Sequence, residues 1–506
     1  MKKSFIYSRT LNERFLWQAK YKNCTDFVQV FNKTTLTLCK RKYKFALTLC
    51  KKTRMNMEFK RQILKDLKEW KESNFRKPLV LRGARQTGKT TVVNHFSKEF
   101  DTYIYLNLEK ESDKNLFENK KDIKEIFQMI CFERNISPKG ETLLFIDEIQ
   151  NSANAVMQMR YFFEELPEVF VIGAGSLLEI MMDVHKISFP VGRVEYKYLF
   201  PMTFEEFLLA LEENQAAELL NTIPIPSFAH KKMIDLFRLY TFVGGMPEAV
   251  LRYKQTKDFL QVAQVYNSLF SSYKDDVSKY AKNANETTII RHIIETVPFE
   301  VGNRITFANF GNSGYKSKEV SSSLKTLERA MLLYLRYPIT NACIPLFPDS
   351  KLKPHLQFLD SGLLNHALKI TGFYYKDDSL NEIYNGKLAE QIVGQELLAK
   401  NINSFEIPLF WTREKKQSNA EVDFLTIYDG NVIPIEVKSG KSGTLKSLHS
   451  FIDNSDNNIA VRLYSGEYSI EENITPIGRK SYKLINLPLY CVSKINEYLI
   501  EIIPTL

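Results

Sequence analysis

The sequence lacks the features that define several whole classes of protein. It has six cysteines but no CxxC pair, and Cys131, Cys343 and Cys491 lie far apart, so neither a zinc site nor a disulfide framework is predicted. The longest mostly apolar run, Val169–Leu178, is much shorter than the roughly 20 residues of a membrane-spanning helix. The basic start is not followed by an apolar core of roughly 7–15 residues, so no secretory signal is predicted. We expect a cytoplasmic protein with no membrane partner.

The composition that remains is that of an ordinary globular protein. The chain has 506 residues, of which 44% are hydrophobic and 25% are charged. These fractions exclude a disordered or fibrous protein. At about 100–200 residues per domain, the length predicts three or four domains.

The basic charge of the chain is confined to its first tenth. The net charge is +10, but residues 1–54 carry 14 Lys and Arg against 2 Asp and Glu, which leaves 55 and 57 for residues 55–506. Two interpretations of the basic N-terminal extension, residues 1–56, stay open. It is a tail that contacts nucleic acid or a membrane surface, or it is translated upstream sequence before a start at Met55 or Met57. We favour the second, so the basic balance gives no clue to function.

A phosphate-binding loop follows the first predicted helix, Met57–Lys71. The apolar run Pro78–Leu81 leads into G-x-x-x-x-G-K-T, and a predicted helix, Thr91–Phe100, follows the loop. Glycines let backbone N–H groups curl around phosphates, and the helix N-terminus adds its positive dipole end. We expect Lys89 to reach the β- and γ-phosphates of ATP and Thr90 to bind Mg²⁺. The predicted nucleotide-binding residues are Gly83, Ala84, Arg85, Gln86, Thr87, Gly88, Lys89, Thr90 and Thr91.

Two acidic residues end a second apolar run, Thr142–Ile146. A strand there, after an intervening strand at Tyr103–Leu108, would place Asp147 and Glu148 at the carboxyl end of a parallel sheet, where such sheets bind ligands. We predict that Asp147 holds the magnesium through its water shell. Glu148 would orient and deprotonate the attacking water, which makes it the predicted catalytic base of an ATPase, with Lys89 assisting.

Two further residues are weaker candidates near the same site. Ser176 follows the predicted strand Val169–Ile172 and would sense the γ-phosphate, although a plain turn at the strand end explains it as well. Arg193 follows a turn and would act as an arginine finger on a neighbouring subunit, which requires a ring or dimer. An ordinary surface arginine is the alternative.

These motifs resemble the AAA-type ATPase domain of a large family of bacterial and archaeal ATP-binding proteins. In that family the ATPase domain is joined to a C-terminal domain of unknown function. The resemblance covers essentially all of residues 57–506, and it implies an α/β P-loop NTPase domain over residues 57–203 with ATP and Mg²⁺ as cofactors. It extends through three stretches to which we assign no chemistry: residues 199–207, Gly244-Gly245-Met246-Pro247-Glu248 and Tyr273-Lys274-Asp275-Asp276-Val277. The second of them predicts a helix stop followed by a new start.

The middle of the chain is expected to be helical. Residues 204–285 carry aromatic and leucine stripes that are typical of a helical core. Residues 286–349 predict two helices and a strand, at Thr287–Val297, Ser317–Ala330 and Leu332–Tyr337, with Ser317 as N-cap. This order resembles the winged helix that similar proteins carry here.

Three basic residues of the predicted winged helix would meet DNA phosphates: Lys318, Lys325 and Arg329. A solvated surface with a protein-docking or spacer role is the alternative. The predicted partners are therefore DNA, a protein partner or a second copy of the chain.

A predicted hairpin at residues 421–438 carries four charged side chains. Its strands, Glu421–Tyr428 and Val432–Lys438, are separated by Asp429-Gly430-Asn431. If Asp429 and Gly430 form a two-residue turn, Asp423 faces Glu436 and Glu421 faces Lys438, all on one face. A three-residue turn would shift the register and break this pairing.

Paired carboxylates of this kind predict a metal site. Two carboxylates that face each other repel, and a bound Mg²⁺ would reverse that cost. Lys438 would then orient or activate a water. A predicted helix over Asn381–Lys400 adds a further carboxylate at Glu390.

The order of elements in residues 350–506 resembles the PD-(D/E)xK nuclease core. Besides the hairpin, it includes a strand at Ile407–Thr412, a helix at Thr444–Ile452 and a strand at Ile459–Tyr464. The resemblance implies Glu390, Asp423 and Glu436 as metal ligands and Asp423, Glu436 and Lys438 as catalytic residues, although Val422-Asp423 replaces the usual Pro-Asp.

Two hypotheses of function follow. The protein is an ATP-dependent enzyme that cuts nucleic acid at this site. Alternatively, it is an ATP-driven regulatory switch whose C-terminal domain only binds DNA or protein.

Overall fold

The computed structural model describes residues 59–502, except 119–121, 177, 179–191, 376–381, 416–417 and 441–442. The basic extension, residues 1–56, lies outside the described residues. Within them, no helix combines the length and the apolar character that a membrane span requires.

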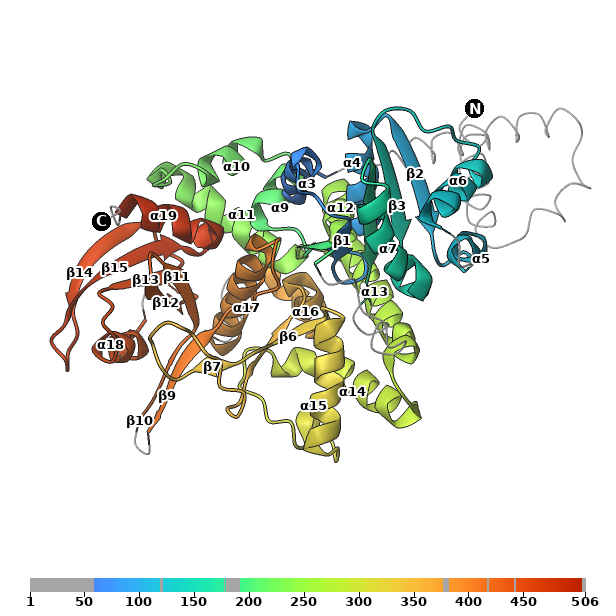
Figure 1. The fold of residues 1–506 in the computed structure, drawn as a ribbon. Coiled ribbons are helices and arrows are strands. Elements are labelled where there is room, and N and C mark those ends of the chain that lie inside the picture. The colour runs from blue at the N-terminus through green and yellow to red at the C-terminus, as the bar shows by residue number, and fades with distance from the viewer. Residues whose placement is uncertain are drawn as a thin grey trace, which may run out of the picture. The chain divides into compact units, whose positions relative to one another are not determined.

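A five-stranded parallel sheet forms the first part of the described chain (Figure 1), in the order β2-β3-β4-β1-β5. Its strands are β1 (Leu79–Arg82), β2 (Thr102–Asn107), β3 (Thr142–Asp147), β4 (Val169–Gly175) and β5 (Glu195–Tyr198). Because β4 lies between β1 and β3, the segment after β4 comes between the loop after β1 and the acids after β3. All five strands point the same way, so their carboxyl ends meet at one edge.

Helices cover both faces of this sheet because its strands are apolar on both faces. In β3, Leu143 and Phe145 face one core and Leu144 and Ile146 face the other, as the period of two requires. Helices α3 (Ile63–Glu72) and α4 (Lys89–Phe96) pack in the first core, and α6 (Ile123–Glu133) and α7 (Ala153–Glu165) in the second. The short helix α5 (Glu111–Lys114) precedes α6.

The first helix begins later than predicted. The sequence predicted a helix from Met57, but α3 begins at Ile63. Just before it, the buried guanidinium of Arg61 donates to the backbone oxygens of Thr87, at 2.9 Å, and Phe200, at 2.7 Å. Residues 59–62 are thus held by side-chain contacts to two distant segments and not by the hydrogen bonds of a helix.

A bundle of helices follows the sheet: α9 (Phe204–Ala210), α10 (Asn214–Leu220), α11 (His230–Val243), α12 (Pro247–Thr256), α13 (Phe259–Tyr280) and α14 (Ala284–Glu300). The predicted stop and restart between α11 and α12 is confirmed. Gly244 has φ of 81° after the last residue of α11, and Pro247 occupies the first turn of α12.

Helix α15 (Ser317–Arg329) follows α14 and leads into a small sheet. β6 (Leu333–Arg336) pairs antiparallel with β8 (His355–Phe358), and β7 (Pro338–Ile339) joins another sheet. The prediction of Ser317 as N-cap is wrong by one residue. Lys316 is the extended residue before the helix, and its N–H donates to the carboxylate of Glu319 at 3.2 Å, which stabilises the helix start without a hydroxyl cap.

The last third of the described chain contains two sheets. One has the order β10-β9-β7 and the other β11-β12-β13-β15-β14. The elements are α16 (Ser361–Ala367), α17 (Glu382–Lys400), β9 (Phe410–Lys415), β10 (Ser418–Val422), β11 (Phe424–Tyr428), β12 (Asn431–Val437), α18 (Lys446–Asp453), β13 (Ile459–Tyr464), β14 (Ser469–Ile474), β15 (Ser481–Pro488) and α19 (Ile495–Ile502). Short 3-10 helices lie at Ser97–Glu99, Asn115–Phe117, Ile149–Asn151, Ser227–Ala229, Phe310–Asn312, Thr371–Tyr375 and Leu489–Lys494.

The helical bundle and this last third share one hydrophobic core, which also includes Ala84, Phe200 and Met202. Helix α17 is its central connection. The buried carboxylate of Glu396 accepts hydrogen bonds from the backbone N–H of Phe204 at 2.9 Å and from the hydroxyl of Tyr240 at 2.6 Å. The helix that carries Glu390 is therefore tied directly to the segment that follows β5.

Candidate functional site

The loop between β1 and α4 has the backbone of a phosphate cradle. Gln86 has φ of 65° and Gly88 has φ of 98°, so the chain turns through left-handed conformations before α4 begins at Lys89. Gly83 is held so closely that a Cβ there would lie 2.3 Å from the backbone oxygen of Leu199. The predicted strand, loop and helix are thus present, with α4 starting two residues earlier than the predicted Thr91.

Lys89 lies buried inside this loop. Its ammonium donates to the backbone oxygens of Gly83 and Ala84, both at 2.9 Å. Burial lowers the pKa of Lys89 to about 8, and attraction to Glu148 and Asp147 opposes that shift. A buried ammonium whose only partners are neutral carbonyls is stabilised strongly by a nearby anion. The surroundings of Lys89 therefore suit a phosphate group.

Thr90 and Asp147 meet at the carboxyl edge of the sheet, as predicted. The hydroxyl of Thr90 donates to the carboxylate of Asp147 at 2.8 Å, and the hydroxyl of Tyr105 lies 3.3 Å from the same oxygen. Asp147 is buried. Adjacent hydroxyl and carboxylate oxygens are the ligand set that Mg²⁺ prefers, so these two residues fit the predicted ion.

Glu148 is placed by an unusual backbone conformation. Its φ of 51° is left-handed, which turns its side chain away from the line of β3. The side-chain amide of Gln150 donates to its carboxylate at 2.5 Å. Glu148 lines a pocket of about 600 Å³ whose other lining residues include Arg85, Gln150, Ser176 and Lys279.

Arg85 of the phosphate loop contacts a helix, α13, whose position beside the loop was not predicted from the sequence. Its guanidinium forms an ion pair with the buried carboxylate of Asp276 on α13. Lys279, one turn further on, also pairs with Asp276, at 2.9 Å. The hydroxyl of Tyr273 lies 3.4 Å from the backbone oxygen of Arg85. The stretch Tyr273–Val277, to which the sequence assigned no chemistry, therefore contacts the phosphate loop.

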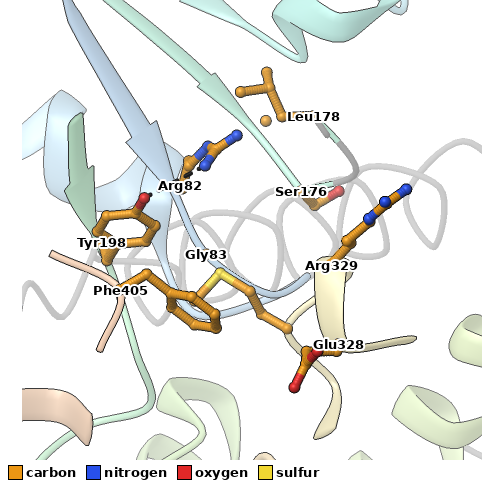
Figure 2. A pocket seen from close by; sticks show the side chains of 10 residues that line it. Arg82, Gly83, Ser176, Leu178, Tyr198, Glu328, Arg329 and Phe405 are labelled. Carbon is orange, nitrogen blue, oxygen red and sulfur yellow. Dashed lines mark hydrogen bonds between the residues drawn. The ribbon is translucent and has the colours of Figure 1, made fainter. Parts of the chain in front are cut away.

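A second, smaller pocket borders Gly83 (Figure 2). Ser176 borders it as well as the larger pocket, so this candidate lies between the two. Figure 2 shows Arg329, at the end of α15, near Ser176, and the lining also includes Phe405 and Glu328. Arg329, a candidate for DNA contact, thus lies beside the phosphate loop.

Arg193 forms an ion pair within its own chain. Its guanidinium donates to the carboxylate of Glu164, near the end of α7, at 2.8 Å. The arginine-finger hypothesis for this residue stays a prediction.

The hairpin of the last third has the predicted register. Phe424 lies opposite Ile435, and Tyr428 lies opposite Asn431. Asp429 and Gly430 form the two-residue turn with φ of 46° and 70°, both left-handed as such turns require. The three-residue alternative is therefore excluded.

This register brings Asp423, Glu436 and Lys438 together. The carboxylate of Asp423 accepts the backbone N–H of Val437 at 2.7 Å, and the ammonium of Lys438 lies 2.6 Å from the carboxylate of Glu436. Electrostatic contact with Glu390 of α17 extends the group. Sequence reasoning from period and turn type therefore placed Asp423, Glu436 and Lys438 in one neighbourhood.

The predicted pairing of Glu421 with Lys438 is wrong, although Glu421 stays in electrostatic contact with Glu390, Asp423 and Glu436. The predicted strand Glu421–Tyr428 is broken at Asp423, so Glu421 belongs to β10, in the other sheet, opposite Thr412. Its carboxylate lies 2.7 Å from the imidazole of His355 and 3.8 Å from the guanidinium of Arg304. A strand can change sheets at one residue, and the sequence pattern alone does not mark that residue.

The acids of this group hold protons more tightly than usual. Burial raises the pKa of Glu436 to about 8 and that of Glu390 well above its ordinary value, and the neighbouring Asp423 adds to both shifts. The pKa of Asp423 is also raised by burial. The second carboxylate oxygen of Glu436 is buried without a hydrogen-bond partner, an arrangement that a cation would relieve.

Arg336 reaches this group from β6, and sequence reasoning missed it. The buried guanidinium donates to the backbone oxygens of Asp423 and, at 3.3 Å, of Pro408, and it lies 3.8 Å from the ring of Phe424. Burial lowers its pKa to about 10, and attraction to Glu390 and Asp423 opposes that shift. Within the described ranges, no three or more His, Cys, Asp or Glu side chains are arranged to hold a metal ion.

Three regions of the chain match family models. Residues 75–208 match an AAA domain, residues 234–373 match a domain of unknown function (DUF8612), and residues 385–490 match another domain of unknown function (DUF4143). Together with the phosphate loop and the parallel sheet, the first match identifies an AAA-type ATPase domain. Among curated proteins, none matches this chain.

Two solved structures show distant similarity to this chain. A Walker-type ATPase of Pyrococcus abyssi is 15% identical, with coverage of 62% of this chain and 97% of that one, at a TM-score of 0.39. The Thermotoga maritima RuvB Holliday junction branch migration motor is also 15% identical, with coverage of 59% and 94%, at a TM-score of 0.27. Similarities this low carry no argument about function.

Proposed function

We propose that the AAA domain binds ATP with Mg²⁺ at the phosphate loop and hydrolyses it, with Glu148 as catalytic base. One observation carries this proposal: a single edge of the sheet gathers a buried lysine, a hydroxyl beside a carboxylate, and a glutamate that lines a pocket. In a nucleotide complex, Lys89 donates to the β- and γ-phosphates. Thr90 and Asp147 hold the ion, which supplies charge neutralisation at the phosphates.

Within this site, each side chain has one task in our proposal. The carboxylate of Glu148, steadied by the amide of Gln150, orients a water and accepts its proton. Ser176, at the end of the intervening strand β4, lines the same pocket and contacts the γ-phosphate. Lys89 balances the charge that builds up on the transferred phosphoryl group.

The test compares two variants in a phosphate-release assay and a fluorescent-nucleotide binding assay. Glu148→Gln is expected to bind ATP normally and to lose ATPase activity on the order of a hundredfold or more, because it keeps the shape but cannot accept a proton. Lys89→Ala is expected to lose nucleotide binding as well. Full hydrolysis by Glu148→Gln would exclude this residue as the base.

For the C-terminal region we infer one of two functions, each supported by a specific observation. Cleavage of nucleic acid is supported by the contact of Asp423, Glu436 and Lys438 in the arrangement that resembles a PD-(D/E)xK core, and by the unpartnered oxygen of Glu436. A regulatory switch without cleavage is supported by Arg336, which already supplies a positive charge among the carboxylates. The second is favoured, because the charge of Arg336 belongs to the fold and already balances the buried carboxylates.

Divalent-metal binding to the full-length protein distinguishes these two functions. Titration calorimetry with Mn²⁺ is run on wild type, on Asp423→Ala and Glu436→Ala, and on Asp429→Ala at the exposed tip of the same hairpin as control. Saturable binding that both cluster variants lose and the control keeps supports a nuclease, and cleavage of single- and double-stranded DNA and RNA is then measured. Binding that is unaffected by the cluster variants supports the switch.

DNA is the partner that we propose for the region of α14, α15 and the β6–β8 pair, in the manner of a winged helix. Lys318 and Lys325 are exposed on α15, which supports this proposal. Binding to a duplex is expected to weaken with rising salt and to show a shallower salt dependence in the double variant Lys318→Ala and Lys325→Ala. An unchanged salt dependence would leave protein docking as the role of this surface.

A further inference from the structure

The guanidinium of Arg61 lies buried beside the phosphate loop, although this residue comes before α3 and the sheet. It donates to the backbone oxygen of Thr87 at 2.9 Å and to that of Phe200 at 2.7 Å. Its Nε lies 3.0 Å from the carboxylate of Glu206 on α9, and the two side chains are 5% and 4% exposed. A Cβ at Gly88 would lie 3.7 Å from Nη1 of Arg61. Each nitrogen of this side chain therefore faces a fixed oxygen, and one of these oxygens belongs to the loop.

The peptide that joins Thr87 to Gly88 is the part of the loop that Arg61 holds. In a trans peptide the C=O and the N–H lie in one plane and point in opposite directions. Because the oxygen of Thr87 points to Arg61, the N–H of Gly88 points away from it. The interior of the loop is marked by the ammonium of Lys89, which donates to the backbone oxygens of the loop's first two residues. Backbone N–H groups that face such an interior are the donors by which these loops bind phosphate.

This peptide is one that turns over easily. A peptide flips through a change of ψ in the residue before it and of φ in the residue after it. Gly88, with φ of 98°, has no Cβ to oppose such a change. After a flip, the oxygen of Thr87 would point at the bound phosphates, which repel its partial negative charge. The hydrogen bond from Arg61 to that oxygen opposes the flip directly.

We propose that Arg61 is a positioning residue of the ATP site, which holds the Thr87–Gly88 peptide with its N–H toward the phosphates. The inference rests on the proposed ATP site and adds to it a residue from outside the loop. In this role Arg61 contacts no phosphate itself. It acts through the backbone, so it contributes to the binding of ATP and ADP alike, and to the transition state as much as to the bound substrate.

The test compares KM and kcat for ATP in the full-length protein, measured by phosphate release. The variant combines Arg61→Met with Glu206→Gln, because removal of the arginine alone would leave a buried carboxylate unpaired. We expect KM to rise on the order of tenfold, as for loss of one charged hydrogen bond, and kcat to stay within about threefold. Competition with a fluorescent nucleotide should show an equal fall in affinity for ADP and for the slowly hydrolysed analogue ATPγS.

Two control variants separate this role from a general loss of stability. Glu206→Gln alone keeps Arg61 and its hydrogen bond to Thr87, so it is expected to keep the wild-type KM. Arg76→Met removes an arginine that also donates to a backbone oxygen, that of Pro167 at 2.6 Å. Pro167 lies just before β4, at the amino end of the sheet and away from the loop, so this variant is also expected to keep the wild-type KM.

A purely structural role predicts a different result, since a smaller folded fraction lowers kcat and leaves KM unchanged. That result, or a wild-type KM in the double variant, would overturn the inference while the ATP site itself stands. Failure of the wild-type protein to bind either nucleotide would overturn the proposed function and this inference together.

Arg61→Lys replaces the double variant if circular dichroism shows that the latter does not fold. Its ammonium keeps the charge beside Glu206 but lacks the planar fork that reaches the oxygens of Thr87 and Phe200. KM should still rise several-fold in this variant, and a wild-type KM would overturn the inference.

Discussion

Replacement of Glu396 by Gln should make the protein's stability less dependent on pH. This residue of α17 is buried, and one of its carboxylate oxygens accepts hydrogen bonds from Tyr240 and from the backbone of Phe204. Burial raises its pKa from 4.5 to about 7, and the hydrogen bonds from Tyr240 and Phe204 oppose that shift. The folded state therefore binds this proton more tightly than the unfolded state does.

The sign and size of the effect follow from that difference. Between pH 4.5 and pH 7 the folded protein holds a proton that the unfolded chain has lost, so the free energy of unfolding falls as pH rises. A difference of about 2.5 pKa units corresponds to about 3 kcal/mol at 1.36 kcal/mol per unit. The glutamine side chain of the variant cannot ionise, and its oxygen still accepts both hydrogen bonds. Relative to wild type, Glu396→Gln should gain about 3 kcal/mol between pH 4.5 and pH 8.

Urea unfolding followed by circular dichroism at a series of pH values from 4.5 to 8 measures this gain. The quantity compared is the difference between the variant and wild type, in which the titration of all other groups cancels. The exposed Glu406 provides a control, since Glu406→Gln should show no such trend. A difference for Glu396→Gln that stays constant with pH would refute the reasoning, because it would mean that Glu396 ionises in the folded protein as it does in the unfolded chain.

Three further predictions concern the phosphate loop and the acid cluster. Gly83→Ala places a Cβ against the backbone oxygen of Leu199 and should lower the free energy of unfolding by about 1–3 kcal/mol and weaken ADP binding; normal values for both would contradict the close contact. Thr90→Ala should raise the Mg²⁺ concentration for half-maximal ATPase activity at least about tenfold, measured by phosphate release, and an unchanged requirement would remove Thr90 from the ion's ligands. Arg336→Met removes a buried cation that donates to the backbone oxygen of Asp423. It should lower the free energy of unfolding by about 3 kcal/mol, measured by urea unfolding at pH 8. An unchanged free energy of unfolding would mean that the buried acids need no cationic partner.

Features set by short stretches of sequence were predictable. The phosphate loop depends on glycines and a lysine within eight residues, and Asp147 and Glu148 follow directly from the end of an apolar strand. The hairpin register follows from a two-residue turn and a period of two. In each case the backbone geometry depends on residues a few positions apart, so a local sequence pattern is enough to predict it.

Features that depend on distant segments were not predictable. Arg85 and Asp276 are 191 residues apart, and no periodicity in α13 distinguishes the turn that meets the loop from any other polar turn. Arg336 resembles an ordinary charged end of a strand until the fold places it among the carboxylates. Strand β14 was not predicted, because it is mostly exposed and polar and only its pairing with β15 makes it a strand.

The break at Asp423 makes chain length a constraint on this hairpin. Before the break, Ala420 and Val422 face one core; after it, Leu425 faces that same core while Phe424 faces another. The residues that face this core thus have even numbers before Asp423 and odd numbers after it. Deleting or inserting one residue here would move each side chain of β11 to the opposite face of its sheet. Homologues should therefore keep the number of residues at this point fixed.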